Sequence, residues 1–139
     1  MATVELLLSP LPVHVRTARL VGVAAARRAG LDDDYVADLR LALGEACTRA
    51  VALHAEHAPD TPVRIVVRDD PGGLTVEVTD HGPPATPLTA DIGDLLGDDD
   101  VDPQVALAVL SGLVDDVEIT SGEDGTTVVL RWPLPPRPV

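Results

Sequence analysis

The sequence predicts an α+β fold, a two-layer sandwich in which three helices cover a mostly antiparallel sheet. Two observations lead to this prediction. Apolar residues between positions 13 and 57 recur at helical spacing, whereas two later stretches alternate in the manner of β-hairpins. Helices that are segregated in this way from antiparallel strands are typical of a two-layer arrangement. The 139 residues suffice for one domain with a hydrophobic core.

The composition describes a folded acidic protein with an aliphatic core. Hydrophobic residues make up 45% of the chain, yet it contains no phenylalanine, one tryptophan and one tyrosine. The formal net charge of −13 would repel the phosphates of DNA or RNA, so direct binding to nucleic acid is not expected. No basic-then-apolar signal peptide opens the sequence, and no apolar run is long enough to span a bilayer. We therefore expect a cytoplasmic protein that does not bind membranes.

The first thirty residues predict a strand and a helix. Val4–Leu8 is a short apolar run that ends at Ser9 and Pro10, as expected of an edge strand. From Val13 to Ala29 apolar residues recur at helical spacing, and Gly30 is a natural C-terminal stop for that helix.

A second helix is predicted to start at three consecutive aspartates. Asp32–Asp34 favour the positive end of a helix dipole, and an apolar face follows as far as His54 or His57. Cys47, the only cysteine, lies on this face, so we expect a buried, unreactive thiol and no internal disulfide. Because the sequence around them offers no set of further ligands, we interpret His54 and His57 as surface residues rather than zinc ligands.

Two hairpins are predicted on either side of a loop. Residues 63–69 and 74–80 have the alternation of paired strands, and the proline and glycines at 71–73 form a tight turn between them. Residues 115–120 and 126–132 show the same pattern around the sequence SGEDG. Both hairpins contribute to the antiparallel sheet.

The segment between the hairpins predicts a loop and the third helix. Prolines, glycines and aspartates fill residues 80–102, and an apolar helix follows at 104–113. The aspartates of the loop lack the glycine and glutamate spacing of a calcium-binding EF-hand, so no metal site is predicted. The single domain is expected to span residues 1–132, with a disordered proline-rich tail at 133–139.

Three stretches carry a resemblance to a known family: VADLRLALGEACTRAV at 36–51, VTDHG at 78–82, and the chain from 112 to 132. They resemble the RsbW-type anti-sigma factors, which have the GHKL (Bergerat, histidine kinase-like ATPase) fold, and in particular their actinobacterial UsfX-like branch. The resemblance covers nearly everything except the tail. It implies a Bergerat-type sandwich and a protein that sequesters an alternative sigma factor until an antagonist of the STAS fold releases it.

The resemblance also implies an ATP pocket, whose first motif is altered. In the family a glutamate, which is the base of the kinases, stands four residues before an asparagine that ligates magnesium. Glu45 matches the glutamate, but Arg49 occupies the asparagine position. A guanidinium cannot ligate a metal ion. Its positive charge also favours the anionic form of Glu45, which weakens that carboxylate as a general base.

The second motif of the family, Asp-x-Gly-x-Gly, is altered as well. Asp80 and Gly82 match it, and the resemblance implies that Asp80 accepts a hydrogen bond from the adenine amino group. Pro84, preceded by Pro83, replaces the second glycine, which removes backbone donors and stiffens the segment.

The third and last motifs complete the implied pocket. Gln104 and Ala106 stand where the family has glycines that admit the phosphates to a helix N-terminus. The Asp102 carboxylate would repel phosphate at the same place. Gly125–Thr127 fits the last motif, which places Thr126 in the pocket.

The sequence thus predicts an anti-sigma factor that has lost its kinase activity. Neither ATP nor Mg²⁺ is expected as a cofactor, and Glu45 would be catalytic only in an active kinase. Two alternatives stay open: an ATP-dependent serine kinase that phosphorylates the STAS antagonist, and a scaffold that binds the antagonist alone. The implied, degenerate ATP pocket is lined by Glu45, Arg49, Asp80, Gly82 and Thr126.

The resemblance places the partner surface on the first helix. Arg19 aligns with an arginine that contacts both sigma factor and antagonist in sporulation-type relatives, and Arg16 lies one turn earlier on a similar face. The alternative is that both are solvated helix arginines. Relatives form homodimers, so a homodimer is expected here too.

Overall fold

The computed structural model describes residues 2–83, 114 and 116–135 of the chain. Within these residues it contains two helices and a five-stranded antiparallel sheet, which confirms the predicted α+β class. The third predicted helix, at 104–113, and most of the predicted loop lie outside the described residues. In chain order the elements are β1 (Ala2–Leu8), α1 (Val13–Ala29), α2 (Asp33–His57), β2 (Val63–Asp70), β3 (Gly73–Asp80), β4 (Asp116–Gly122) and β5 (Gly125–Pro133).

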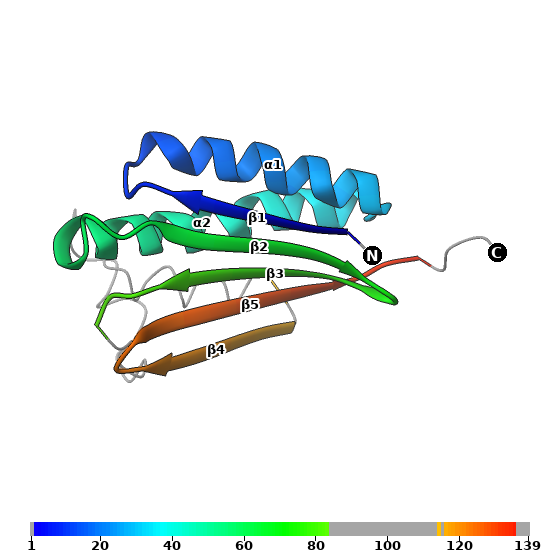
Figure 1. Cartoon of the computed structure of the whole chain (residues 1–139). Helices are drawn as coiled ribbons and strands as arrows, with labels where there is room; N and C mark the ends of the chain where they lie inside the picture. Colours follow the sequence, from blue (N-terminus) through cyan, green and yellow to red (C-terminus); the bar gives the residue numbers. More distant parts are fainter. Residues whose placement is uncertain (1, 84–113, 115, 136–139) are drawn as a thin grey trace, which may run out of the picture.

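All neighbouring strands pair antiparallel in the order β1-β2-β3-β5-β4, so that β3 lies at the centre of the sheet (Figure 1). β1 forms one edge, as its short apolar sequence predicts, and β4 forms the other. Both predicted hairpins are present and close with two-residue turns, at 71–72 and 123–124. Gly72 adopts a φ of 86°, a left-handed conformation that glycine tolerates at no steric cost, and thereby permits the first turn.

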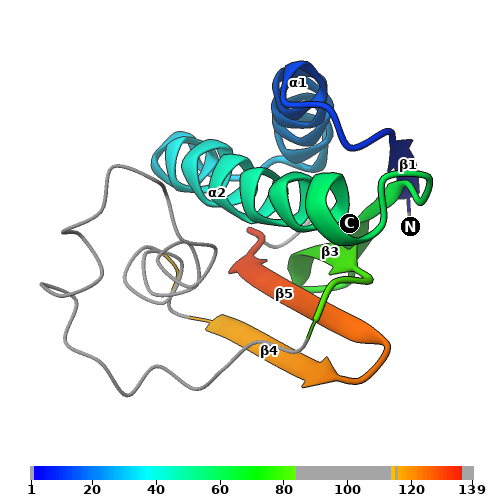
Figure 2. The ribbon, with the colours of Figure 1, turned by 90° about the vertical axis from the view of Figure 1, so that its left-hand side faces the viewer.

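The two described helices lie side by side on one face of the sheet (Figure 2). α2 packs over the central strand β3, whereas α1 packs against α2 and toward β1 and β2. Gly22 of α1 permits a close approach of the two helices, because a Cβ atom there would collide with the side chain of Leu43 in α2.

The helix ends follow the signals in the sequence. Gly30 closes α1 with a φ of 88°, and its N–H donates to the carbonyl oxygens of the last turn. Asp32 caps α2, since its Oδ1 accepts a hydrogen bond of 3.1 Å from the N–H of Asp34. α2 then continues to His57, the later of the two predicted ends.

The core between the helices and the sheet is aliphatic, as the composition predicts. Trp132 is its single aromatic side chain and is 4% exposed. Cys47 is fully buried among the aliphatic residues, which confirms the predicted buried thiol. The large, fully buried aliphatic side chains are Leu39, Leu43, Val63, Ile65, Leu74, Val76, Val78, Val128 and Leu130.

Charged side chains occupy the face of the sheet that points away from the helices. Successive side chains of a strand alternate between the two faces, so the neighbours of the buried valines and leucines point outward. There the arginines of the sheet pair with acidic residues on adjacent strands. The cross-strand ion pairs are Arg64 with Glu5, Arg68 with Glu77, and Arg131 with both Asp116 and Glu118.

The end of β5 overlaps the predicted tail. β5 runs to Pro133, and Leu134 packs against the core while its N–H faces the carbonyl oxygen of Gly72 at 3.5 Å. The first residues of the predicted tail therefore belong to the described fold, and residues 136–139 lie outside it. Neither described helix has the length and apolar character that crossing a bilayer requires.

Candidate functional site

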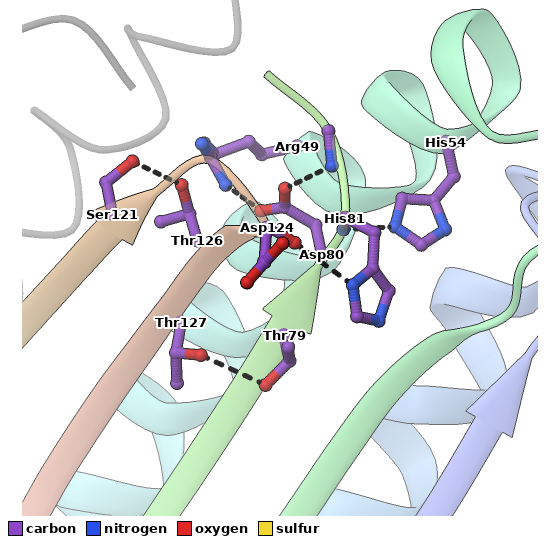
Figure 3. A network of polar contacts seen from close by, with 10 residues as sticks. Arg49, His54, Thr79, Asp80, His81, Ser121, Asp124, Thr126 and Thr127 are labelled. Atoms are coloured by element: carbon purple, nitrogen blue, oxygen red, sulfur yellow. Dashed lines mark hydrogen bonds and ion pairs between the residues drawn. The ribbon is translucent and has the colours of Figure 1, made fainter. Parts of the chain in front are cut away.

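α2 and the end of β3 bring Arg49 and Asp80 together in a buried ion pair (Figure 3). One guanidinium nitrogen of Arg49 donates to Oδ2 of Asp80 at 2.5 Å, and the two side chains are 3% and 1% exposed. The other carboxylate oxygen, Oδ1, accepts from the N–H of Gly82 at 2.9 Å. Both oxygens of Asp80 are therefore occupied by groups of the chain itself.

The strand pattern explains why an aspartate is buried here. Leu74, Val76 and Val78 point toward the helices, and Asp80 continues this alternation as the last residue of β3. A buried carboxylate must be paired or hydrogen-bonded, and Arg49 on the facing side of α2 supplies the charge. The pair is thus built by the ordinary alternation of a core strand.

Arg49 keeps one hydrogen-bonding group without a partner. Its Nε atom is buried and donates to no acceptor among the described residues. Such an unsatisfied buried donor costs about 1–3 kcal/mol, more for a charged group. The ion pair is therefore not arranged for maximal stability of the fold.

Glu45 lies one turn before Arg49 on α2 and is half-buried. The expected interaction between the two side chains is not formed in the described structure, because the guanidinium pairs with Asp80 instead. Glu45 makes no ion pair or hydrogen bond with another described side chain. Glu45, the base that the resemblance implies, and Arg49, which replaces the metal ligand, therefore do not pair with each other.

Thr126 and Gly82 both lie beside Asp80. Thr126 is opposite Asp80 in the pairing of β3 with β5, is 1% exposed, and its hydroxyl bonds to that of Ser121 at 2.9 Å. Gly82 is buried and supplies the N–H that binds Asp80. The structure therefore brings Arg49, Asp80, Gly82 and Thr126 together, as the pocket implied by the resemblance requires.

Gly125 holds the β4–β5 hairpin against the end of β3. It has a φ of 128°, and a Cβ atom there would collide with the carbonyl oxygen of Asp80. His81, the residue after β3, adds a hydrogen bond to the turn of this hairpin, since its Nδ1 lies 3.1 Å from the carbonyl oxygen of Asp124. The glycine of the last family motif therefore has a structural reason in this chain.

His54 is fully buried, so its interpretation as a surface residue is wrong. Its Nε2 accepts from the N–H of His81 at 2.8 Å, and its Nδ1 lies 2.7 Å from the carbonyl oxygen of Thr61. Because Nε2 accepts, the proton of the neutral ring lies on Nδ1, which donates to Thr61. His54 thereby ties the end of α2 to the chain that follows Asp80.

A helical signal could have identified the burial of His54. Leu43, Cys47, Ala50 and His54 follow one another at spacings of four, three and four residues. These spacings place the histidine on the buried face of α2.

Cys47 lies on the same helix, and its thiol is fully buried. Burial raises the pKa of the Cys47 thiol from 9.0 to about 12, against the opposing effect of the Arg19 charge. The thiolate is the nucleophilic form of cysteine, so a raised pKa makes the thiol unreactive. The predicted inert cysteine is consistent with this shift.

Arg16 and Arg19 lie on α1, away from the contacts of the Asp80 carboxylate. Arg16 is exposed, and Arg19 is half-buried with its guanidinium across Gly44 of α2, where a Cβ atom would collide with it. Neither arginine forms an ion pair with a described residue. In addition, no cluster of three potential metal ligands occurs in the part of the chain that the structure describes.

Comparison with known proteins yields one family and two structures. The family model described as the histidine kinase-like ATPase domain matches residues 8–132. A crystal structure of the RsbU and RsbW domains of Rv1364c from Mycobacterium tuberculosis is 22% identical, with a TM-score of 0.69. That match covers 100% of this chain and 35% of the other, so the chain spans about a third of its length.

A second structure is more distant. The mycobacterial sensor histidine kinase MprB is 17% identical, covers 98% of this chain and 100% of that chain, and has a TM-score of 0.46. No curated protein matches the sequence significantly.

Proposed function

Because the chain belongs to the histidine kinase-like ATPase domain family, we propose that it has kept this fold as a protein-binding module and is an anti-sigma factor without kinase activity. It sequesters an alternative sigma factor and is released by a STAS-domain antagonist. The fold is shared with the structure of the RsbU and RsbW domains. Fold alone does not give a function, so the proposal depends on the site.

The ion pair between Arg49 and Asp80 is the main support for the proposed loss of kinase activity. The resemblance assigns Asp80 to the adenine amino group, but its two oxygens already accept from Arg49 and Gly82. With Asp80 only 1% exposed, a base could reach the carboxylate only by displacing the guanidinium. That displacement would leave a buried charge unpaired, which costs about 3–5 kcal/mol.

The metal side of the site supports the same conclusion. Arg49 stands where the family has an asparagine ligand, and a guanidinium offers no lone pair to Mg²⁺. Its positive charge would also repel the cation. One residue therefore blocks both the base position and the metal position.

The mechanism proposed is competition between proteins for one surface. Arg16 and Arg19 on α1 contribute to that surface, which a sigma factor occupies and an antagonist then takes over. Bound sigma factor would be excluded sterically from RNA polymerase. A homodimer is part of the proposal and provides two such surfaces.

Calorimetric titration with ATP, with and without Mg²⁺, tests the missing nucleotide site. We expect no heat of binding at millimolar ATP from a protein that circular dichroism shows to be folded. Micromolar, Mg²⁺-dependent binding would contradict the proposed loss of activity. Size-exclusion chromatography with each sigma factor of the native host tests sequestration, and a stable complex with none of them would reject it.

The serine kinase remains the second candidate because of Glu45. This carboxylate is half-buried and forms no ion pair with the described residues, so it is not neutralised as a base. Phosphate transfer from ATP to a serine of a STAS protein would establish the kinase. Loss of that transfer in Glu45→Ala, with Glu56→Ala as a control on the same helix, would assign the base.

A further inference from the structure

α1 and α2 leave a groove between them, and most of the charged residues that line it are arginines. One hollow of about 880 Å³ is lined by Arg16, Arg19, Arg27 and Arg40, with a single carboxylate, Asp33. Its apolar lining includes a leucine of α1 that is 63% exposed, at position 20. Four cations around one hollow are notable in a chain with a net charge of −13.

These arginines are also free of ion pairs within the described structure. Those of the sheet all pair with carboxylates, and Arg49 pairs with Asp80. No described carboxylate lies within ion-pair distance of the remaining described arginines, although the protein has 23 acidic residues. The described arginines without an ion pair are Arg16, Arg19, Arg27, Arg28 and Arg40, all on α1 or α2.

The groove continues into an apolar part. A second hollow of about 410 Å³ shares Arg16 and Arg19 with the first and is otherwise lined by Thr48 and by apolar residues such as Val13 and Val51. Val13 is 68% exposed. Along α1 the two hollows extend from Pro12 to Arg27, which corresponds to roughly 22 Å at 1.5 Å per residue.

We infer that this groove, between residues 12–27 of α1 and the facing side of α2, binds an amphipathic helix of a partner protein. The helix has about 15 residues, the length that matches the groove. Acidic side chains at one of its ends meet Arg27 and Arg40, which line only the first hollow, and apolar side chains at the other end cover the hollow near Val13. The inference rests on the proposed function for the identity of the protein that carries this helix.

Charge complementarity selects this occupant. Arginine guanidinium groups bind carboxylates through two parallel hydrogen bonds, which gives direction as well as attraction. A helix that lies in an apolar groove is anchored by residues at positions i, i+3 or i+4, and i+7. Because Arg27 and Arg40 line only the first hollow, positive charge is greater at that end of the groove, and the partner helix is bound in a single direction.

A nucleic acid would satisfy the arginines but not the rest of the groove. The apolar end offers nothing to a phosphate backbone. A helix with both acidic and apolar residues satisfies both parts. Binding measurements with peptide and DNA probes distinguish the two occupants.

The test uses the full chain and a synthetic probe. The probe is a fluorescein-labelled 16-residue helical peptide with leucines along one face and glutamates in one half, and binding is followed by fluorescence anisotropy. Arg27→Glu should weaken binding about tenfold or more. Arg28→Glu, with the same charge change at the next residue of α1 but outside both hollows, should change it less than threefold.

Two further probes decide the chemistry and direction. A peptide with the glutamates moved to its other half, and one with glutamine in their place, should each bind at least tenfold more weakly. Equal effects of Arg27→Glu and Arg28→Glu, or equal binding of the three peptides, would overturn the inference. Tight binding of a labelled 20-base-pair DNA duplex that Arg27→Glu abolishes would overturn it as well.

This test can fail independently of the proposed function. If a sigma factor binds the protein with an affinity that Arg27→Glu does not change, the proposed function stands and the inference about the groove is rejected. Peptide binding with the expected pattern, in a protein that binds no sigma factor, would leave the groove and reject the function.

Discussion

Arg49 is bound to Asp80, 31 residues later in the chain, rather than to Glu45, four residues earlier on its own helix. A surface pair at i,i+4 on a helix stabilises it by about 0.2–0.5 kcal/mol. Losing a buried partner costs several times more, so the guanidinium goes where the buried carboxylate is. Under the proposed function, this one preference closes the position that the resemblance assigns to a nucleotide base.

Removal of the guanidinium should destabilise the protein by about 3–5 kcal/mol, because Asp80 would remain buried without its counter-charge. We expect this loss for Arg49→Met, measured as the free energy of unfolding in urea. In the double variant with Asp80→Asn much of it should be recovered, since the amide is neutral and can still accept from Gly82. Additive effects of the two changes would show that the pair is not coupled.

Cys47 makes the stability of the protein dependent on alkaline pH. Burial raises the pKa of its thiol from 9.0 to about 12, so the folded chain keeps a proton that the unfolded chain loses. Stability is therefore unaffected below pH 9 and falls above it, by up to ~1.4 kcal/mol per pH unit. Unfolding in urea between pH 8 and 11 measures this slope.

Cys47→Ala provides the matched control for that measurement. Below pH 9 the variant is expected to be less stable than the wild type because of the lost side-chain volume, so the slopes above pH 9 are compared rather than the absolute values. A wild-type protein whose stability has the same dependence on pH as the variant would disprove the role of the thiol.

At the residue scale, the resemblance named the residues of an implied pocket but not their contacts: Glu45, Arg49, Asp80, Gly82 and Thr126. The structure brings the last four together, whereas Glu45 forms no ion pair with the Arg49 guanidinium. The pairing of Arg49 depends on where the end of β3 meets α2, which no local rule describes. The burial of His54 could have been derived from its helical spacing, but its two hydrogen-bond partners could not, because they lie in a loop and in the residue after β3.

At the scale of the elements, the two described helices are held together at two glycines with different neighbours. A Cβ atom at Gly22 would meet Leu43, which is fully buried, whereas one at Gly44 would meet the end of the half-buried Arg19 side chain. The first neighbour cannot move without disturbing the core, and the second can swing toward solvent. The same substitution should therefore have opposite consequences at the two sites.

Gly22→Ala is expected to destabilise the protein by about 1–3 kcal/mol through overpacking between α1 and α2. Gly44→Ala should be close to neutral or slightly stabilising, because alanine favours a helix by up to about 1 kcal/mol over glycine. Thermal unfolding of the two variants checks this difference. A larger loss of stability in Gly44→Ala than in Gly22→Ala would contradict the structure.

Most of the element boundaries could be predicted because each is set by a local signal. Gly30, Asp32 and Gly72 lie where a backbone conformation or a cap demands those residue types, and the structure uses all three. The strand order could not be derived from these signals, since β5 pairs with β3 across the long segment that separates the hairpins. Pro133 was assigned to the tail because the end of the chain is rich in proline, yet it ends β5.

At the scale of the whole molecule, the net charge of −13 opposes the compact state through repulsion between the carboxylates. Salt screens this repulsion but also weakens the cross-strand ion pairs of the sheet, each of which contributes about 0–1 kcal/mol at the surface. We expect the repulsion to dominate. Raising KCl from 20 to 200 mM should increase the free energy of unfolding in urea, and a decrease would show that the ion pairs dominate instead.

The pairing of the sheet arginines and the isolation of those on α1 and α2 give the molecule an electric polarity. α1 carries four arginines and no acidic residue while the chain as a whole is strongly negative, so positive charge is concentrated at this one helix. This local field would turn an acidic partner so that it meets α1 first. Salt would weaken that orientation, because it screens the field.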